Sequence, residues 1–313
     1  MKLIVQIPCL NEEKTIGLTI QSIPRKIPGI RKVQVLIIDD GSNDGTVAEA
    51  KRAGADYIIS LPKICGLAHV FMIGLEEALK LKADLIVNLD ADNQYHAEDI
   101  PKLIQPILDK KAEIVIGDRQ VHQIKHFSFA KRKLQALGSF LIRQVSGLPI
   151  RDAVSGFRAF SQAAALKINL RNHFSHTLET IIFASKERIP IASVPVTTNP
   201  TARPSRLAPS TWWFIKKSIS SLIRVCLIYE PFKVFLSFGS ILFVIGSIPI
   251  GRFLYFCFRG HAQGHIQSLV IGSIVMILGF ISIAIGLIAD LLSINRALIE
   301  NQLLDHRRMH LGL

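Results

Sequence analysis

Two carboxylates and an amide stand at alternate positions in the segment NLDADNQY, residues 88–95. They belong to Asp90, Asp92 and Gln94, which follow an apolar run typical of a buried strand. Because alternate side chains of an extended chain point to one side, their oxygens are expected to meet at one point. Adjacent carboxylates repel unless a cation lies between them, and hard oxygen ligands suit Mg²⁺ or Mn²⁺. The segment indicates a divalent-metal site, with a polar turn bonded to its own backbone as the alternative.

Three other polar segments also follow apolar runs typical of buried strands. They are IPCLNEE (7–13), DDGSNDGT (39–46) and GDR (117–119). The apolar runs alternate with segments of helical spacing, which predicts an α/β fold with a mostly parallel sheet flanked by helices. Ligands of such sheets bind at the carboxyl ends of the strands, where these polar segments fall. Their shared position favours a single site at one edge of the sheet.

The same spacing rules predict the individual elements of the fold. Extended segments are expected over 3–8, 33–39, 56–60, 83–90, 112–119 and 191–199. Helices are expected over 11–23, 47–55, 65–81, 131–147 and 174–188, with a loop leading into a strand over 151–160.

Two long runs without charge lie in the C-terminal part, at 234–251 and 268–289. A helix needs about 20 apolar residues to cross a bilayer. The second run reaches that length by itself, and the first reaches it by continuing through Arg252 into FLYFCF. With 49% hydrophobic and 19% charged residues, the chain is more apolar than an ordinary soluble protein. Two transmembrane helices are therefore expected, with a buried helical hairpin as the alternative.

Basic residues flank the two apolar runs on their outer sides. Lys216, Lys217, Arg224 and Lys233 precede the first run, and Arg296, Arg307 and Arg308 follow the second. The connector RGHAQGH between the runs contains only Arg259. Because basic flanks favour the cytoplasmic side, a multi-pass protein of the cell membrane with both ends in the cytoplasm is expected. The N-terminus lacks the pattern of a signal peptide, so the catalytic part is expected to be cytoplasmic.

The chain carries a formal net charge of +13. Given two apolar spans, the expected partners of this charge are the membrane lipids and phosphorylated substrates. No dense Lys/Arg run with interleaved aromatics is present, so no nucleic-acid partner is expected. The cysteines lack metal-site spacing and are expected to be reduced thiols.

The motifs PCLNEE, DDGSNDGT, DADNQ, GDR and DAVSGFRAF occur in this order along the chain. Together they resemble the family-two inverting glycosyltransferases that use nucleotide sugars. Within that group the sequence is most similar to the dolichyl- or polyprenyl-phosphate glycosyltransferases, including the dolichol-phosphate mannose synthase-like enzymes. The resemblance covers residues 3–210, and the apolar runs match membrane-anchored members. It implies a GT-A fold and inverting transfer of a hexose from a UDP- or GDP-sugar.

The resemblance assigns roles to residues at matching positions. Contacts with the nucleotide sugar are implied for Pro8, Glu12, Asp39, Asp40 and Asp90. The metal and diphosphate motif matches Asp90, Asp92 and Gln94, with Mn²⁺ or Mg²⁺ as the cofactor. Of the acidic pair at 39–40, Asp40 is the stronger candidate for touching the base. The alternative for this pair is capping of the following helix, a role that Ser42 or Asp44 also suits.

Arginines are the candidates for binding an acceptor phosphate, because guanidinium donors fit phosphate oxygens. They are Arg119, Arg132, Arg203 and Arg206. A solvated basic face is the alternative for them. Asp152 matches an acidic position of the family's acceptor loop, so Asp152 and Arg119 are the catalytic candidates. Arg158 is interpreted as a structural partner of that loop, and Glu179 is as readily an ordinary surface residue.

The expected organisation is a catalytic domain at 1–210, an amphipathic interfacial helix at 211–232, transmembrane helices at 233–258 and 266–292, and a cytoplasmic tail at 293–313. The expected function is hexose transfer to a polyprenyl phosphate lipid at the cytoplasmic face. One alternative is glycosylation of a diacylglycerol-type lipid hydroxyl, which requires a base such as Asp152. Another is a membrane scaffold without catalysis. The sugar, the nucleotide base and the oligomeric state, a homo-oligomer included, stay open.

Overall fold

The structure is a computed structural model that describes residues 1–120, 138–140, 142–144, 146–168, 176–199, 220, 223, 227, 230–260 and 264–311. The chain divides into two compact units. One comprises Met1–Ser221 with His306–Leu313, and the other comprises Leu222–Asp305. Each unit has its own architecture, and the first contains the sheet that the sequence predicts.

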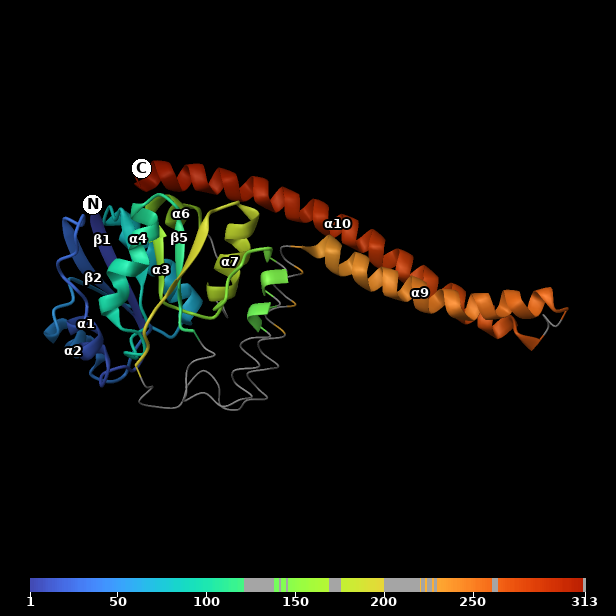
Figure 1. Cartoon of the computed structure of the whole chain (residues 1–313), viewed down its shortest axis with the longest axis horizontal. Coiled ribbons are helices and arrows are strands. Elements are labelled where there is room, and N and C mark those ends of the chain that lie inside the picture. Colours follow the sequence, from blue (N-terminus) through green and yellow to red (C-terminus); the bar gives the residue numbers. More distant parts are fainter. Residues whose placement is uncertain are drawn as a thin grey trace. The chain divides into compact units, whose positions relative to one another are not determined.

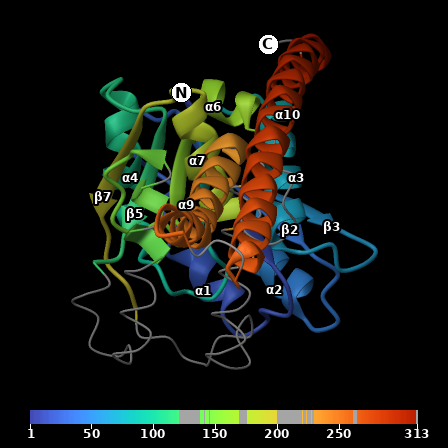
Figure 2. The ribbon, with the colours of Figure 1, turned by 90° about the vertical axis from the view of Figure 1, so that its right-hand side faces the viewer.

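A seven-stranded sheet forms the centre of the first unit, in the order β3-β2-β1-β4-β6-β5-β7. The strands are β1 (Lys2–Cys9), β2 (Lys32–Asp39), β3 (Tyr57–Ser60), β4 (Leu85–Asn88), β5 (Ile114–Asp118), β6 (Arg158–Ser161) and β7 (Ile191–Pro195). Strands β3 and β7 are the two edges (Figure 2). Every strand pair is parallel except those of β6, which runs antiparallel to β4 and β5. The carboxyl ends of β1, β2, β4 and β5 therefore share one edge, which also receives the start of β6.

Helices cover both faces of this sheet (Figure 1). They are α1 (Ile16–Gln21), α2 (Thr46–Arg52), α3 (Leu67–Lys80), α4 (Ile100–Leu108), α6 (Gln162–Lys167) and α7 (His176–Lys186), with a short 3₁₀ turn at Ala97–Asp99. The mostly parallel α/β fold expected from the sequence is confirmed.

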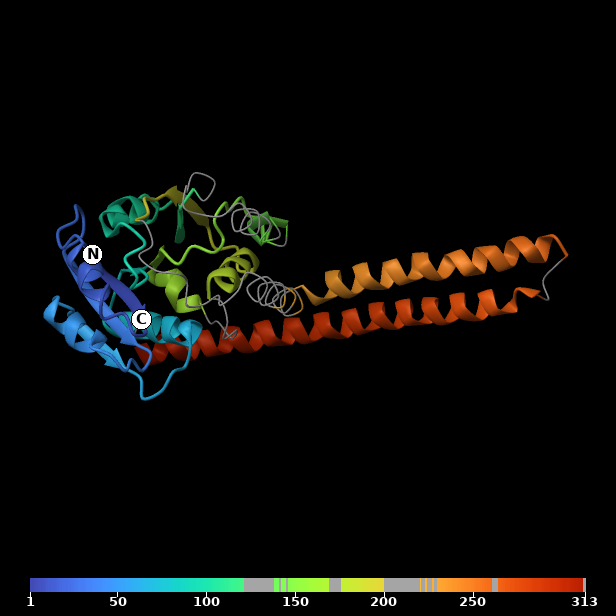
Figure 3. The same ribbon diagram turned by 90° about the horizontal axis from the view of Figure 1, so that it is seen from below.

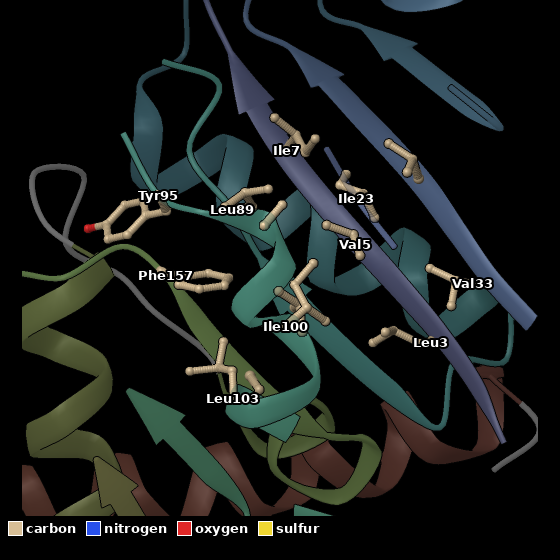
Figure 4. Close-up of a cluster of buried hydrophobic side chains, with 14 of the residues drawn as sticks. Leu3, Val5, Ile7, Ile23, Val33, Leu89, Tyr95, Ile100, Leu103 and Phe157 are labelled. Carbon is tan, nitrogen blue, oxygen red and sulfur yellow. The ribbon is translucent and has the colours of Figure 1, made fainter. Parts of the chain in front are cut away.

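Alternating side chains of the central strands supply the core. Leu3, Val5 and Ile7 of β1 face the same cluster as Ile100 and Leu103 of α4 (Figure 4). The intervening residues of β1 face α3, which packs on the opposite side of the sheet. Because helices cover both faces, the inner strands are buried at almost every position, which explains their continuous apolar runs.

Helices α4 and α6 were not expected from the sequence, and neither was the direction of β6, although a strand was expected at the end of the segment 151–160. Helix α4 contains Pro106 in its interior, and proline disfavours a helix, so the spacing signal was weak. Helix α6 has only six residues, and β6 only four. A four-residue strand carries no sign of its direction, so its antiparallel insertion between β4 and β5 was not foreseen. The expected helix at 131–147 lies mostly outside the described residues.

The second unit is a hairpin of the long helix α9 (Pro231–Phe258) and most of the long helix α10 (Ile266–Leu311). Both are long and apolar enough to cross a membrane, at Pro231–Phe258 and Ile266–Arg296, with mean hydropathies of 2.1 and 2.6. Only 11% and 22% of the two most apolar windows are buried, so a buried helical hairpin does not fit. Helix α10 extends to Leu311 and therefore includes most of the segment 293–313, which was expected to be a tail. The interfacial helix expected at 211–232 lies almost entirely outside the described residues.

Glycines allow α9 and α10 to lie side by side (Figures 1 and 3). A Cβ atom on Gly239 would lie 2.7 Å from the carbonyl oxygen of Gly279. A Cβ atom on Gly272 would lie 2.7 Å from the carbonyl oxygen of Gly246. Small residues at such contacts let transmembrane helices pack closely, which is the main source of their association in lipid.

Candidate active site

The loops after β1 and β2 interlock through backbone and side-chain hydrogen bonds. The Asn11 amide N–H donates to Ser42 Oγ at 2.8 Å, and the Asn43 N–H donates to Asn11 Oδ1 at 2.9 Å. The N–H of Glu12 donates to Thr46 Oγ1 at 2.8 Å. These bonds place the predicted nucleotide-binding segments 7–13 and 39–46 next to one another, as parallel strand ends require.

The two aspartates at the end of β2 are both buried and both bonded to backbone. Asp39 Oδ1 accepts the N–H of Ser42 at 3.1 Å. Asp40 is 5% exposed, and its two oxygens accept the N–H groups of Cys65 and Gly66 at 2.6 and 2.9 Å. Asp40 thus fastens the loop before α3 to the end of β2. Its contact with a nucleotide base stays a prediction.

Capping of α2 does not involve this aspartate pair. Asp44 Oδ1 accepts the N–H of Thr46, the first residue of α2, at 3.0 Å. Asp44 therefore bonds the first turn of α2 from the position before its N-cap, Gly45, which has no side-chain cap. Asp39 and Asp40 remain candidates for the nucleotide.

The segment 91–94 forms a turn and is not extended, so the same-side alternation expected from the sequence was wrong. Strand β4 ends at Asn88, and Asn93 has φ 56°, in the left-handed region. Asp92 Oδ1 accepts the N–H of Gln94 at 3.0 Å, which is the polar turn considered as the alternative. A turn and a metal site are compatible here, because Asp92 Oδ2 is not used in that bond.

Asp90 lies at the centre of the sheet edge, and its ionisation is unfavourable there. Burial and the neighbouring Asp92 carboxylate raise the pKa of Asp90 to about 7. No group of three His, Cys, Asp or Glu side chains suited to a metal occurs among the described residues, so the candidate ligands of the predicted metal site are these two carboxylates and the Gln94 amide. Oxygen donors with excess negative charge fit a divalent cation. A Cβ on Gly156 would fill the space beside Asp90, so the glycine keeps that space open.

Arg119 and Asp152 form a buried bidentate ion pair at the end of β5. Arg119 Nε donates to Asp152 Oδ2 at 2.7 Å, and Nη2 donates to Oδ1 at 2.9 Å. Their side chains are 7% and 3% exposed. The sequence predicted both residues as catalytic candidates but not that they bind each other. The third guanidinium nitrogen of Arg119, Nη1, does not donate to Asp152.

Arg158 holds the loop that carries Asp152. Its guanidinium is fully buried and donates to the carbonyl oxygens of Ser155, Ala153 and Thr177 at 2.8–2.9 Å. The structural interpretation of Arg158 is confirmed. Burial lowers the pKa of Arg158 to about 10, so the group still carries its charge at neutral pH.

Glu179 is fully buried in α7, which excludes the ordinary surface residue that was one of the two alternatives for it. In the same helix the His176 ring stacks on Phe71 of α3, with 4.5 Å between the ring centroids. Burial and the positive charge of Arg158 lower the pKa of His176 to about 3, so this histidine is neutral.

A polar network that the sequence did not reveal joins the central strands below the site. Gln6 Nε2 donates to Asn88 Oδ1 at 3.0 Å, and Asn88 Nδ2 donates to the Gly156 carbonyl at 2.8 Å. The Gly156 N–H donates to the hydroxyl of buried Tyr95 at 3.1 Å. Amides inside otherwise apolar strands were the available signal, because buried polar side chains require partners.

Three predicted arginines, Arg132, Arg203 and Arg206, lie outside the described residues. The chain that leads to the last two is fixed beside the acidic turn. Asn199 donates its N–H to the Gln94 carbonyl at 2.8 Å and its side-chain amide to the Asn93 carbonyl at 3.0 Å. These two bonds place Asn199, the last described residue before both arginines in the sequence, beside the predicted metal site.

The fold places the protein in a known structural class. Glucosyl-3-phosphoglycerate synthase of Mycobacterium tuberculosis, solved with Mn²⁺, UDP and glucosyl-3-phosphoglycerate, aligns with a TM-score of 0.55 and 21% identity. The alignment covers 72% of this chain and 78% of that chain. At this identity the likeness concerns the fold alone, which is that of GT-A glycosyltransferases.

Comparison of the sequence with known families identifies the family of this protein. Residues 4–168, more than half of the chain, match the family described as Glycosyl transferase family 2, and the protein belongs to that family. The family-two resemblance drawn from the motifs is thereby confirmed. The protein is a glycosyltransferase whose C-terminal part contains two apolar helices suited to a membrane.

Several relatives are named for lipid phosphates. A Methanococcus voltae protein named UDP-N-acetylglucosamine–dolichyl-phosphate N-acetylglucosaminyltransferase is 31% identical over 214 residues, covering 61% of this chain and 83% of its own. The undecaprenyl-phosphate mannosyltransferase of Micrococcus luteus is 27% identical, covering 54% and 70%. The polyprenol monophosphomannose synthase of Mycolicibacterium smegmatis is 28% identical, covering 53% and 64%.

Proposed function

We propose that this membrane glycosyltransferase transfers a hexose from a nucleotide sugar to a polyprenyl phosphate at the cytoplasmic face, with inversion at the anomeric carbon. The names of its relatives support a lipid-phosphate acceptor. The observation that carries the proposal is the buried Arg119–Asp152 pair beside the Asp90 turn. It would present to the incoming acceptor a guanidinium held in one orientation, with a carboxylate that is engaged in holding it.

The donor half of the site consists of the acidic strand ends. Asp90 and Asp92, with Gln94, would hold Mn²⁺ or Mg²⁺ against the diphosphate of the donor. The ion would neutralise the charge on the departing nucleoside diphosphate. Pro8, Glu12, Asp39 and Asp40 would border the nucleotide, at the ends of β1 and β2 and in the loops that follow, where hydrogen bonds connect these segments.

The acceptor half consists of basic side chains. Arg119 would meet the lipid phosphate, and Arg132, Arg203 and Arg206 would add further guanidinium groups. A phosphate oxygen would attack the anomeric carbon as the bond to the diphosphate breaks. Because a phosphate monoester is already anionic, the reaction depends on positioning and charge stabilisation more than on proton removal.

The hydrogen bonds of Asp152 help to choose between a phosphate and a hydroxyl as the acceptor. A lipid hydroxyl needs a general base within reach of its proton. Both oxygens of Asp152 accept hydrogen bonds from Arg119, so this carboxylate is already engaged in orienting the guanidinium. We therefore favour the phosphate acceptor over the diacylglycerol-type hydroxyl.

The membrane orientation is also proposed. The basic flanks Lys233 and Arg296 favour the cytoplasmic side, and the connector at 259–265 would lie across the membrane. This arrangement places the catalytic domain in the cytoplasm, where nucleotide sugars are made.

A panel of radiolabelled UDP- and GDP-sugars tests the proposal. Membranes containing the full chain should transfer label from one donor to extractable lipid in the presence of Mn²⁺ or Mg²⁺. Mild acid releases the labelled sugar from a polyprenyl glycosyl phosphate, whereas mild alkali removes the acyl chains from a glycosylated diacylglycerol. Asp92→Asn should abolish most of the transfer without loss of the folded protein. Full activity of that variant with the metal chelated would contradict the assigned metal role.

A further inference from the structure

The register of β4 and β6 places a glycine opposite the central acidic residue. Asn88 pairs with Arg158 in this antiparallel ladder. In an antiparallel ladder, each step forward along one strand pairs with a step backward along the other. Two steps beyond the pair of Asn88 and Arg158, Gly156 therefore comes opposite Asp90. Directly opposite side chains lie on the same face of a sheet and touch.

Gly156 has no room for any side chain. A Cβ atom there would lie 2.7 Å from both carboxylate oxygens of Asp90 and 3.0 Å from its Cγ. Carbon and oxygen atoms that are not bonded to each other stay about 3.4 Å or more apart, since closer approach is repulsive. A methyl group at this position would therefore have to displace the carboxylate or the loop.

The loop itself is held in place on several sides. The Gly156 N–H donates to Tyr95 Oη, its carbonyl accepts from Asn88 Nδ2, and Asn88 in turn accepts from Gln6. Arg158 fixes the residues just before it through the Ser155 and Ala153 carbonyls. Because the loop is anchored and buried, Asp90 is the group that would have to move.

We propose that Gly156 is a positioning residue for the metal-binding carboxylate of Asp90. It leaves Asp90 the one orientation in which its oxygens lie at the sheet edge beside Asp92. The inference rests on the proposed function, in which these two aspartates bind a divalent ion. The same loop presents Asp152 to Arg119, so a single segment sets the donor and the acceptor halves of the site.

The test is Mn²⁺ binding to the purified full-length protein, measured by electron paramagnetic resonance with Mn²⁺ alone as the probe. Gly156→Ala should weaken Mn²⁺ binding roughly 10- to 100-fold, as changes beside metal ligands commonly do. Gly17→Ala is the matched control. Its Cβ would also meet a carboxylate, that of Glu49, but this side chain is partly exposed, pairs with Arg52 in α2 and lies outside the proposed metal site. The control should bind Mn²⁺ as the unaltered protein does.

Two further variants make every outcome decisive. Asp92→Asn should lose Mn²⁺ binding, and its failure to do so would refute the proposed metal site itself. If Asp92→Asn loses the ion while folded Gly156→Ala retains full affinity, the positioning role is wrong and the proposed function stands. If Gly156→Ala does not fold, Tyr95→Phe decides, since it removes the hydroxyl that holds the loop at the Gly156 N–H and the Ser155 hydroxyl. Weaker Mn²⁺ binding by Tyr95→Phe supports the role, and unchanged binding overturns it.

Discussion

Replacing Asp152 with asparagine should destabilise the protein strongly, because it leaves a buried guanidinium without its counter-charge. Arg119 and Asp152 are 7% and 3% exposed and share two hydrogen bonds of 2.7 and 2.9 Å. Removing one partner of such a pair costs about 3–5 kcal/mol. The amide oxygen of the variant still accepts one bond, so the lower end, about 3 kcal/mol, is expected. That loss corresponds to a fall in Tm of roughly 6–12 °C.

The assay is thermal unfolding of the full chain in detergent, with an exposed pair as the control. Arg52 and Glu49 form an ion pair in α2 whose side chains are 79% and 22% exposed. Exposed pairs contribute about 0–1 kcal/mol, so Arg52→Met should leave Tm nearly unchanged. The double change Arg119→Met with Asp152→Leu should recover most of the loss, because it removes both charges. A change in Tm for Asp152→Asn no larger than that of the control would refute this account of the pair.

Three further outcomes are expected. Because the pKa of Asp90 is raised to about 7, the metal-free protein should lose stability as the pH rises from the ordinary carboxyl range towards 7. Asp90→Asn should remove that part of the pH dependence of Tm, and an unchanged pH profile would contradict the raised pKa. Gly239→Ile should lower the thermal stability of the full chain in detergent, because its Cβ would meet Gly279. Gly251→Ile should not lower it, since no described residue lies within 4 Å of a Cβ at that position. Equal effects of the two variants would refute the close contact between α9 and α10. Cysteines placed at 259–265 should react with an impermeant thiol reagent only from outside intact cells, and labelling from the cytoplasm would reverse the proposed topology.

The sequence predicted the sheet because its strands are buried on both faces. Runs such as residues 3–8 and 33–39 are almost uninterrupted in apolar residues, and they became β1 and β2. Parallel strands bring their carboxyl ends together, so the placement of the polar segments followed from chain order alone. The direction of β6 could not be predicted, because a four-residue strand shows no difference between parallel and antiparallel pairing.

The site was predictable in its residue types but not in its contacts. Asp90, Asp92, Arg119 and Asp152 were all named from the sequence. That Arg119 binds Asp152 depends on a loop whose course is set by the buried Arg158, and no local pattern reports such a contact across 33 residues. The turn at 91–94 depends on the left-handed conformation of Asn93, which the alternation of polar residues concealed.

The measurement that tests the central claim most directly compares matched acceptors. Purified full-length protein would receive the labelled sugar nucleotide that it uses, a divalent ion, and one lipid at a time: a polyprenyl phosphate, the corresponding polyprenol, or a diacylglycerol. The account predicts label in the polyprenyl phosphate alone, with free nucleoside diphosphate formed in equal amount. Transfer to the polyprenol or to the diacylglycerol at a comparable rate would contradict it.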